Sequence, residues 1–297
     1  MSDSKILVTG ATGKLGQKVV SSLLNDFNIA PEQLIVTTRS VSKLNELCKL
    51  GVEVREADFS NPESLTKAFK GADRLLLISI DASGPRTQSH LNAITAAEKA
   101  GVSHISYTSM PAAEESPVVF AHEHEATEAA IKLSNIPNVA ILRNNWYFEN
   151  LPEYFASVLQ TGFWLTSSGE GKIAEVSRED LAYAAAASLV KDIKGKKTFN
   201  LNGTEALTHE EMALQINTTL GTSIQVVQLS DEVYKAKLES FELPKPIVDL
   251  CVTMDKHNRL DLSAGNGQDF ESLTGRKPIS FKTWLNSNKS QLLKLAE

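Results

Sequence analysis

The sequence of 297 residues contains only two cysteines, Cys48 and Cys251, which are far apart in the chain. Two isolated cysteines do not make the dense pattern of a disulfide-stabilised secreted domain, and they are typical of a protein from a reducing compartment. Both lie among apolar residues. We therefore expect them to fill space in the core rather than to act as reactive thiols.

Long apolar runs and clusters of basic residues are also missing. No stretch reaches the roughly 18 apolar residues of a membrane-spanning helix. The N-terminal segment MSDSKILVTG has an acidic residue and too short an apolar run for a signal peptide. A net charge of −6 without a basic run argues against nucleic-acid binding. These absences predict a cytoplasmic protein without a nucleic-acid or membrane partner, and they leave its oligomeric state open.

Short apolar strands alternate with helical patterns through the first half of the chain. Strands are predicted at 5–9, 34–38, 52–56, 74–79, 104–108 and 138–142. Helices are predicted between them, at about 14–26, 40–50, 62–70, 86–101 and 119–134. Nearly continuous apolar, β-branched strands are typical of a parallel sheet that is covered on both faces. Right-handed crossovers then predict an α/β fold with a Rossmann-type doubly wound parallel sheet.

The alternation becomes less regular after about residue 150. Strands are predicted at 162–166, 198–202 and 224–229, and helices at 177–190, 208–220 and 231–241. Thr208 and Glu211 have the spacing of a capping box. No linker rich in proline, glycine or serine separates the halves. We therefore predict a Rossmann domain over 1–150 and a smaller C-terminal α/β lobe over 151–297, which re-enters the sheet and forms a cleft at its carboxyl edge.

Three glycines, Gly10, Gly13 and Gly16, follow the first predicted strand within KILVTGATGKLGQKVV (5–20). In a dinucleotide-binding loop the first glycine allows a sharp turn, the second lets the backbone approach a pyrophosphate, and the third lets the helix pack closely on the strand. The N-terminus of that helix offers free N–H groups and a partial positive charge to phosphates. The spacing alone is a weak signal, but the strand before it and the helix after it favour a dinucleotide site over a structural turn.

The residue after the second strand indicates which dinucleotide binds. An NAD site has Asp or Glu here to bind the ribose 2′-hydroxyl, whereas this sequence has Arg39. A guanidinium group can bind a 2′-phosphate through two hydrogen bonds, and Lys43 adds charge one helical turn later. These residues predict NADPH; the alternative is a solvent-facing arginine in a turn. Asp58, after the third strand, and Ser79, after the fourth, are further candidates for cofactor contacts, although each alone suits a plain turn.

Several longer segments resemble one family of proteins. They occur in the order VTGATGKLG, LLLIS, HISYTS, AHEHEATEAAI, ILRNNWYFENL, GEGKIAEVSREDLA and LTGRKP. The pattern resembles the NmrA-like branch of the atypical short-chain dehydrogenase/reductases, and within it the bacterial NADPH-dependent quinone oxidoreductase and triphenylmethane reductase group. The resemblance spans nearly the whole chain and is weakest between about 230 and 270.

This resemblance implies a Rossmann domain with a small C-terminal lobe, NADPH as the cofactor, and hydride transfer to a quinone or a similar electron-poor aromatic. It implies cofactor contacts at Gly10, Ala11, Thr12, Gly13, Lys14, Leu15, Arg39, Ser79 and Asn144. Some members of the wider branch bind a dinucleotide without turnover, so a non-catalytic NADP(H) sensor is the alternative function. A reductase of another small molecule, such as a dye, an enone or an imine, is a third possibility.

The Tyr-x-x-x-Lys dyad of typical short-chain dehydrogenases is absent, because none of the five tyrosines has a lysine four positions later. A quinone acceptor relaxes the need for that dyad, since its reduced oxygen is a stabilised phenolate and positioning of the ring can supply most of the rate. The catalytic residue is therefore left unassigned. The candidates for the substrate pocket are Tyr107, His124, Asn145, Trp146 and Tyr147.

These candidates have structural alternatives. The HEHE sequence around His124 lacks the His-Glu-x-x-His spacing of a zinc protease, so no metal is expected. In a helix, His124 and Glu128 share a face, and a polar helix face is the main alternative to substrate binding. Tyr107 suits core packing equally well. The polar and aromatic segment RNNWYFEN, which contains Asn145, Trp146 and Tyr147, is more than core packing requires after a buried strand, and its rings offer a stacking surface.

Overall fold

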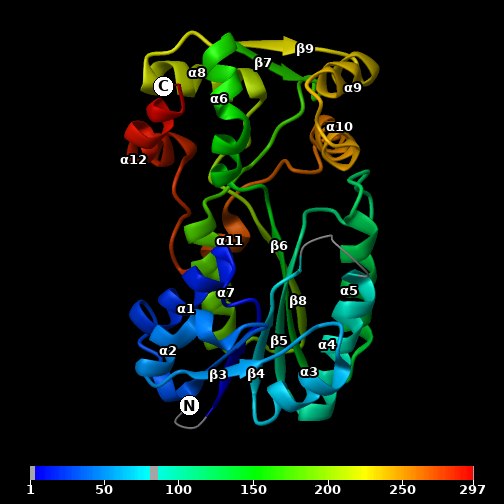
Figure 1. Cartoon of the computed structure of the whole chain (residues 1–297), viewed down its shortest axis with the longest axis vertical. Helices are drawn as coiled ribbons and strands as arrows, with labels where there is room; N and C mark the ends of the chain where they lie inside the picture. The colour runs from blue at the N-terminus through cyan, green and yellow to red at the C-terminus, as the bar shows by residue number, and fades with distance from the viewer. Residues whose placement is uncertain (1–3, 81–85, 297) are drawn as a thin grey trace. The chain divides into compact units, whose positions relative to one another are not determined.

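Seven strands form the larger of two sheets in the computed structural model, which describes residues 4–80 and 86–296. They are β1 (Ile6–Val8), β2 (Leu34–Thr38), β3 (Glu53–Glu56), β4 (Arg74–Leu77), β5 (His104–Ser109), β6 (Asn138–Asn144) and β8 (Lys196–Leu201). Their order is β3-β2-β1-β4-β5-β6-β8, and the pairs from β3 to β6 are parallel (Figure 1). Because the order reverses between β1 and β4, this is a doubly wound Rossmann-type sheet, and the predicted fold class is confirmed.

Helices cover both faces of this sheet (Figure 1). One side carries α1 (Lys14–Asn25), α2 (Asn45–Lys49) and α7 (Arg178–Val190), and the other carries α3 (Pro62–Phe69), α4 (Arg86–Ala100) and α5 (Ala121–Leu133). The covered strands are apolar, since β2 is buried along its whole length and Leu7 and Leu75 are fully buried. Each such side chain contributes roughly 1.5–3 kcal/mol through its burial, and this core fixes the edge at which the strands end.

The chain divides into two compact units. The sheet unit comprises Met1–Met110, His122–Asn144 and Glu179–Phe199, and the second unit comprises Pro111–Ala121, Asn145–Arg178 and Asn200–Glu297. Nearly all of α7 and most of β8 therefore belong to the sheet unit, although both follow residue 150. The division into 1–150 and 151–297 stays a prediction about organisation, whereas the two units describe how the chain packs.

Helices make up most of the second unit. They are α6 (Leu151–Thr161), α8 (His209–Leu220), α9 (Asp231–Ser240), α10 (Lys245–Arg259), α11 (Gln268–Thr274) and α12 (Phe281–Leu293). A parallel pair, β7 (Phe163–Thr166) and β9 (Gln225–Gln228), completes the unit. Aromatic side chains dominate its core, where the ring of Phe148 lies 5.2 Å from that of Phe281 and 5.5 Å from that of Trp284.

The capping box predicted for α8 is present. The Thr208 hydroxyl accepts a hydrogen bond from the N–H of Glu211 at 3.1 Å, and the Glu211 carboxylate accepts one from the N–H of Thr208 at 2.9 Å. These two bonds satisfy backbone donors that the first turn leaves unpaired. They fix the N-terminus of α8 as the sequence predicts.

The helix predicted at 40–50 is broken into two short pieces. A 3-10 turn, η2 (Val41–Leu44), precedes α2, and the backbone at Leu44 departs from helical geometry with φ −118° and ψ 21°. Other 3-10 turns are η1 (Pro31–Gln33), η3 (Phe148–Asn150) and η4 (Lys294–Ala296). The tighter turn is common where a short helix begins, and a helical pattern in sequence does not separate the two forms.

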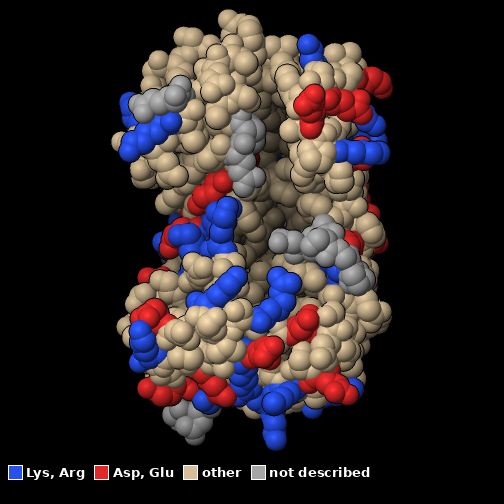
Figure 2. Space-filling model, in the orientation of Figure 1, with Lys and Arg blue, Asp and Glu red and all other residues tan. Residues whose placement is uncertain are grey.

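Charged side chains of both signs are interspersed on the face of the molecule that Figure 2 shows. This mixing agrees with the modest net charge of −6. In the part of the chain that the structure describes, no helix combines the length and apolar character needed to cross a membrane.

Candidate functional site

The glycine loop leaves the start of α1 open to an anion. Gly13 is the N-cap residue, and the first turn of α1 contains no acidic side chain. The Gly13 N–H donates to the Gly10 carbonyl at 2.9 Å, which closes the turn between β1 and α1. The N–H groups of the first turn, together with the positive end of the helix dipole, are therefore suited to bind phosphate oxygens.

Each glycine of the loop meets a different constraint. Gly10 has a φ of 62°, in the left-handed region that favours glycine. A Cβ atom on Gly16 would lie 2.2 Å from the Gly10 carbonyl oxygen, so only glycine permits this close packing. A Cβ atom on Gly13 would meet the same oxygen at 3.3 Å, which a small shift can relieve. Gly13 is also exposed, and because it has no side chain, its backbone is accessible at the surface.

Arg39 follows β2, and its side chain is exposed. No hydrogen bond or salt bridge joins it to another described residue. The guanidinium group is therefore free to bind a phosphate through two parallel hydrogen bonds. An arginine at this position, where an NAD site has a carboxylate, fits the 2′-phosphate of an NADP-type dinucleotide.

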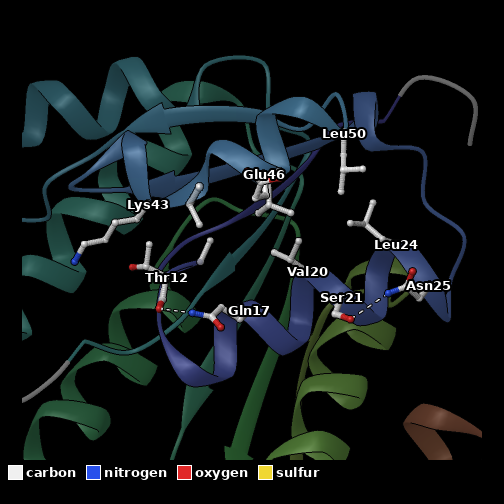
Figure 3. A pocket seen from close by; sticks show the side chains of 12 residues that line it. Thr12, Gln17, Val20, Ser21, Leu24, Asn25, Lys43, Glu46 and Leu50 are labelled. Carbon is white, nitrogen blue, oxygen red and sulfur yellow. Dashed lines mark hydrogen bonds between the residues drawn. The ribbon is translucent and has the colours of Figure 1, made fainter.

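A hollow of about 520 Å³ begins beside the glycine loop (Figure 3). Thr12 and Lys43 lie at one end of it, and Leu24 and Leu50 lie at the other. The rest of its lining comes from α1 and from the segment that ends in α2. Lys43 is exposed and brings a second positive charge to the end of the hollow that is nearest the loop.

Asp58 and Ser79 follow β3 and β4. The N–H and the hydroxyl of Ser60 donate to Oδ1 of Asp58 at 2.9 and 2.8 Å, and these bonds, helped by the charge of Arg39, lower the pKa of Asp58. Asp58 is thus a carboxylate at neutral pH. Ser79 is half-buried, and its N–H donates to Oγ1 of Thr108 at 2.8 Å.

Asn144 ends β6 and is 6% exposed. Neither its side-chain nitrogen nor its side-chain oxygen has a hydrogen-bond partner among the described residues. A buried polar group without a partner costs about 1 to 3 kcal/mol, so this amide is suited to bind a polar group of a ligand.

The cofactor candidates come together at one edge of the sheet unit. The glycine loop follows β1, Arg39 follows β2, Asp58 follows β3, Ser79 follows β4, and Asn144 ends β6. All these strands run in the same direction, so the residues lie at their carboxyl ends, where doubly wound sheets bind ligands. A helix end suited to anions, an arginine without a partner among the described residues and an unpaired amide are together suited to bind a dinucleotide.

Comparison with known families decides the classification. The model described as the NmrA-like family matches residues 2–285. The chain belongs to the NmrA-like family. This NmrA-like protein is 36% identical over 250 residues to quinone oxidoreductase 2 of Escherichia coli strain K12, and the match covers 84% of this chain and 86% of the relative.

Solved structures of the NmrA-like protein's relatives agree with this classification. The NADPH-dependent quinone oxidoreductase of Escherichia coli complexed with NADPH has a TM-score of 0.89 and 33% identity, covering 97% of this chain and 99% of that one. The Citrobacter sp. triphenylmethane reductase complexed with NADP(H) has a TM-score of 0.86 and 33% identity, covering 99% and 100%. The resemblance predicted from the sequence is confirmed.

Tyr107 and His124 lie together inside the sheet unit of the NmrA-like protein, with exposed fractions of 0% and 4%. The Tyr107 hydroxyl is 2.8 Å from Nδ1 of His124, and the Arg86 guanidinium is 2.7 Å from Nε2. Because arginine can only donate, Nε2 accepts, and the Nδ1–H group donates to Tyr107. The imidazole is therefore neutral, and burial, followed by the charge of Arg86, lowers the pKa of His124 to about 2.

His90 extends this buried network. Its Nε2 atom accepts from the N–H of Ile80 at 3.2 Å, and its Nδ1 atom is 3.0 Å from the hydroxyl of Thr127. Burial, followed by the charge of Arg86, lowers the pKa of His90 to about 3, and burial raises the pKa of Tyr107. The burial of Tyr107 and the engagement of both His124 ring nitrogens favour a structural role for these two candidates over substrate binding.

The buried histidines predict acid sensitivity. A histidine in the unfolded chain takes up a proton near its ordinary pKa of 6.5, whereas His90 and His124 resist protonation down to about pH 3 and 2 in the folded protein. The free energy of unfolding should therefore fall as the pH decreases from 6.5 toward 3. Urea unfolding at a series of pH values measures this slope. His124→Gln should flatten it, and His122→Gln, at an exposed position of the same helix, should not. Equal slopes for wild type and His124→Gln would contradict the prediction.

Asn145 is a structural junction within the second unit. It is 1% exposed, and its Nδ2 group donates to Oδ1 of Asn202 and to the carbonyl of Ser263, both at 2.8 Å. Its Oδ1 atom accepts from the N–H of Trp146 at 2.8 Å. The first two bonds join separate segments of the unit, and the third is local. They leave Asn145 little capacity to bind a substrate, so the structure favours a positioning role.

Trp146 and Tyr147 are half-buried and keep aromatic surface for stacking. The indole N–H of Trp146 donates to Oδ1 of Asn258 at 3.2 Å, and its ring lies 5.7 Å from that of His257, nearly edge-on. The Arg178 guanidinium lies 5.1 Å from the centroid of the Tyr147 ring. The sequence identified both aromatic residues, but it gave no signal for Asn258 and His257 at the end of α10.

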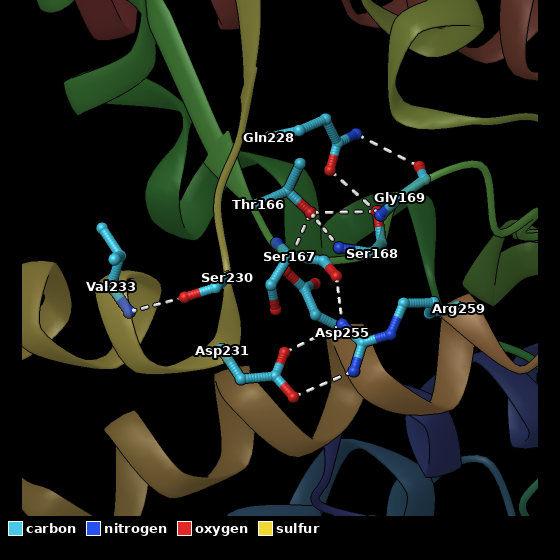
Figure 4. A network of polar contacts seen from close by, with 10 residues as sticks. All are labelled: Thr166, Ser167, Ser168, Gly169, Gln228, Ser230, Asp231, Val233, Asp255 and Arg259. Carbon is cyan, nitrogen blue, oxygen red and sulfur yellow. Dashed lines mark hydrogen bonds and ion pairs between the residues drawn. The ribbon is translucent and has the colours of Figure 1, made fainter.

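The end of α10 also fixes the loop that follows β7 (Figure 4). The Asp255 carboxylate accepts from the Thr166 hydroxyl at 2.8 Å and from the N–H of Ser167 at 2.6 Å. Arg259 donates to both carboxylate oxygens of Asp231, at 2.8 and 2.9 Å. A Cβ atom on Gly171 would lie 2.2 Å from a backbone carbonyl of α10. These contacts support a fixed scaffold within the second unit.

Proposed function

We propose that this NmrA-like protein is an NADPH-dependent oxidoreductase that transfers a hydride to a quinone or a similar electron-poor aromatic. The observation that carries the proposal is Arg39, which is exposed, unpaired with other described residues, and placed where a dinucleotide's 2′-substituent binds in this fold. The two relatives described above, a quinone oxidoreductase and a triphenylmethane reductase, indicate the class of acceptor.

The proposal assigns a role to each group around the cofactor. The first turn of α1 binds the pyrophosphate, with Gly10, Ala11, Thr12, Gly13, Lys14, Leu15 and Gly16 forming its loop. Arg39 and Lys43 bind the 2′-phosphate, Asp58 binds the adenine edge, and Ser79 lines the cofactor's path. The unpaired amide of Asn144 binds a polar group of the cofactor. NADPH supplies the hydride, and the protein orients it.

The acceptor is expected to stack on aromatic surface from Trp146 and Tyr147. Flat rings favour offset stacking with an electron-poor aromatic, and Asn258 holds the Trp146 indole in one orientation. Positioning of this kind can supply much of the rate when the product oxygen is a stabilised phenolate. The absence of a Tyr-x-x-x-Lys pair in the sequence is compatible with such a reaction.

The decisive experiment measures loss of the reduced-nicotinamide absorbance by the purified protein. NADPH and NADH are compared, each with a simple benzoquinone and each with a cationic triphenylmethane dye. We expect acceptor-dependent oxidation above the uncatalysed rate, with NADPH preferred over NADH. Tight NADPH binding without turnover of any acceptor would instead support the alternative, a redox sensor that binds the dinucleotide without consuming it.

A further inference from the structure

Glu175 has an unpaired carboxyl oxygen, and it directly precedes Val176, which pairs with the segment that carries Trp146 and Tyr147. The Oε2 atom of Glu175 is buried and has no hydrogen-bond partner among the described residues. Its neighbour Val176 donates its N–H to the Trp146 carbonyl at 3.0 Å and pairs with Tyr147 in an isolated parallel bridge. The backbone next to Glu175 is thus fixed to the segment that carries the proposed stacking rings.

The backbone of Glu175 is fixed from its other side as well. The N–H of Gly203 donates to the carbonyl of Ala174 at 2.9 Å. A Cβ atom on Gly203 would lie only 2.0 Å from the Glu175 carbonyl oxygen, so the two backbones touch and only glycine permits the contact. Because contacts hold the chain on both sides of Glu175, its backbone is fixed in place.

A negative charge, that of Glu149, acts on this carboxyl. Glu149 raises the pKa of Glu175, and its own carboxylate accepts the N–H of Arg178 at 2.9 Å. The Arg178 guanidinium lies over the Tyr147 ring, and no salt bridge joins a cation to Glu175 within the described residues. Burial first, and then the charge of Glu149, raise the pKa of Glu175 to about 8. Glu175 therefore holds a proton at neutral pH.

A purely structural position would not require an ionisable group. Glutamine has the same shape, stays neutral at every pH and offers two donors for hydrogen bonds. A carboxylic acid that is neutral near the working pH and ionises slightly above it is suited to release a proton during a reaction. Glu175 combines this property with an unpaired oxygen and a place beside the aromatic segment.

We propose that Glu175 supplies the proton that a quinone takes up when this protein reduces it. The inference rests on the function proposed above. A hydride from NADPH carries two electrons to the quinone and leaves a hydroquinone anion and NADP+. The O–H bond of Glu175 then breaks, its proton passes to the anionic oxygen to complete the hydroquinone, and the carboxylate regains a proton from water.

Two acceptors separate proton donation from a structural role. A quinone needs a hydride and a proton, whereas a cationic triphenylmethane dye becomes neutral when it receives a hydride alone. Glu175→Gln should lower kcat for the quinone by about 100-fold, at the low end for general acid catalysis because the product is a stabilised phenolate. The same variant should keep its kcat for the dye and its Kd for NADPH within about twofold. Glu170→Gln, at an exposed position of the same segment, is the matched control and should change none of these values.

Two further measurements test whether Glu175 holds the proton that the quinone receives. Removing the neighbouring negative charge with Glu149→Gln should lower the pKa of Glu175, so the alkaline limb of the quinone kcat profile should move to lower pH. The glutamine can still accept the N–H of Arg178. Infrared spectroscopy of the protein without NADPH should show a protonated-carboxyl band that disappears on titration near pH 8 and is missing from Glu175→Gln.

Several results would overturn the inference. Equal losses with the quinone and the dye would mean that Glu175 only maintains the structure. An unchanged quinone rate, or a carboxyl band that does not titrate near pH 8, would mean that another group donates the proton. No turnover of either acceptor by the wild-type protein would overturn the proposed function itself and this inference with it. Failure of the proposed function can be told apart from failure of this inference, because loss of the proton donor alone leaves dye reduction intact.

Discussion

Replacing Gly13 by valine is expected to weaken NADPH binding on the order of 1,000-fold while the protein stays folded. Gly13 has φ −77° and ψ 161°, which any residue can adopt, and its Cβ atom would lie 3.3 Å from the Gly10 carbonyl oxygen. The fold therefore tolerates the change with a small adjustment. The bound pyrophosphate does not, because the branched side chain occupies the space above the first turn of α1.

A titration of the Gly13→Val protein with NADPH, followed by calorimetry, measures this loss. A thermal melt by circular dichroism checks that the protein remains folded. Thr66→Val places the same side chain on an exposed position of α3, away from the loop, and should bind NADPH normally. Gly16→Ala should instead destabilise the protein, because its Cβ atom would lie 2.2 Å from the Gly10 carbonyl oxygen. Retained NADPH binding by folded Gly13→Val would mean that the loop is only a structural turn.

Arg39→Ala should weaken NADPH binding by about 100-fold and leave NADH binding nearly unchanged. A bidentate hydrogen-bonded pair between a guanidinium group and a phosphate contributes about 1.5 to 3 kcal/mol, and NADH has no phosphate at the 2′ position. Arg39 forms no salt bridge or hydrogen bond with another described residue, so its loss should not disturb the fold. The ratio of the two dissociation constants is the quantity to measure.

A matched control for Arg39→Ala is Lys49→Ala. Lys49 is an exposed cation at the end of α2, and its salt bridge is to Glu46 of the same helix. Its removal should leave both dissociation constants unchanged. If Arg39→Ala weakened NADPH and NADH binding equally, the assignment of Arg39 to the 2′-phosphate would be wrong.

The sheet unit could be predicted from the sequence because its signals are local. Each strand is a short apolar run, each helix follows at a regular interval, and the observed bounds differ from the predicted ones by only a few residues. Gly10 and Gly16 were also predictable, since a turn with positive φ and a close helix contact both select glycine. Arg39 was predictable because it stands where the fold normally places an acidic residue.

The second unit was harder to predict because its signals depend on long-range packing. Helices α6, α10, α11 and α12 were not predicted, and α6 directly follows the polar and aromatic segment RNNWYFEN. The environments of Asn144 and Glu175 could not be predicted from the sequence either. Their significance comes from polar atoms that find no partner in the fold, and a sequence does not show which groups a fold leaves unpaired.

Each of the two units is built from several separate stretches of the chain, and this limits where the protein can be cut into fragments. Strand β8 lies beside β6 at the end of the seven-stranded sheet, yet it is encoded some 50 residues after β6. A fragment that ends near residue 150 would contain the dinucleotide loop but would leave the backbone N–H and C=O groups of β6 without their neighbour. Such an exposed, apolar strand edge is a template for aggregation, so the nucleotide-binding half is not a separable module, and fusions or truncations should preserve the chain at least through β8.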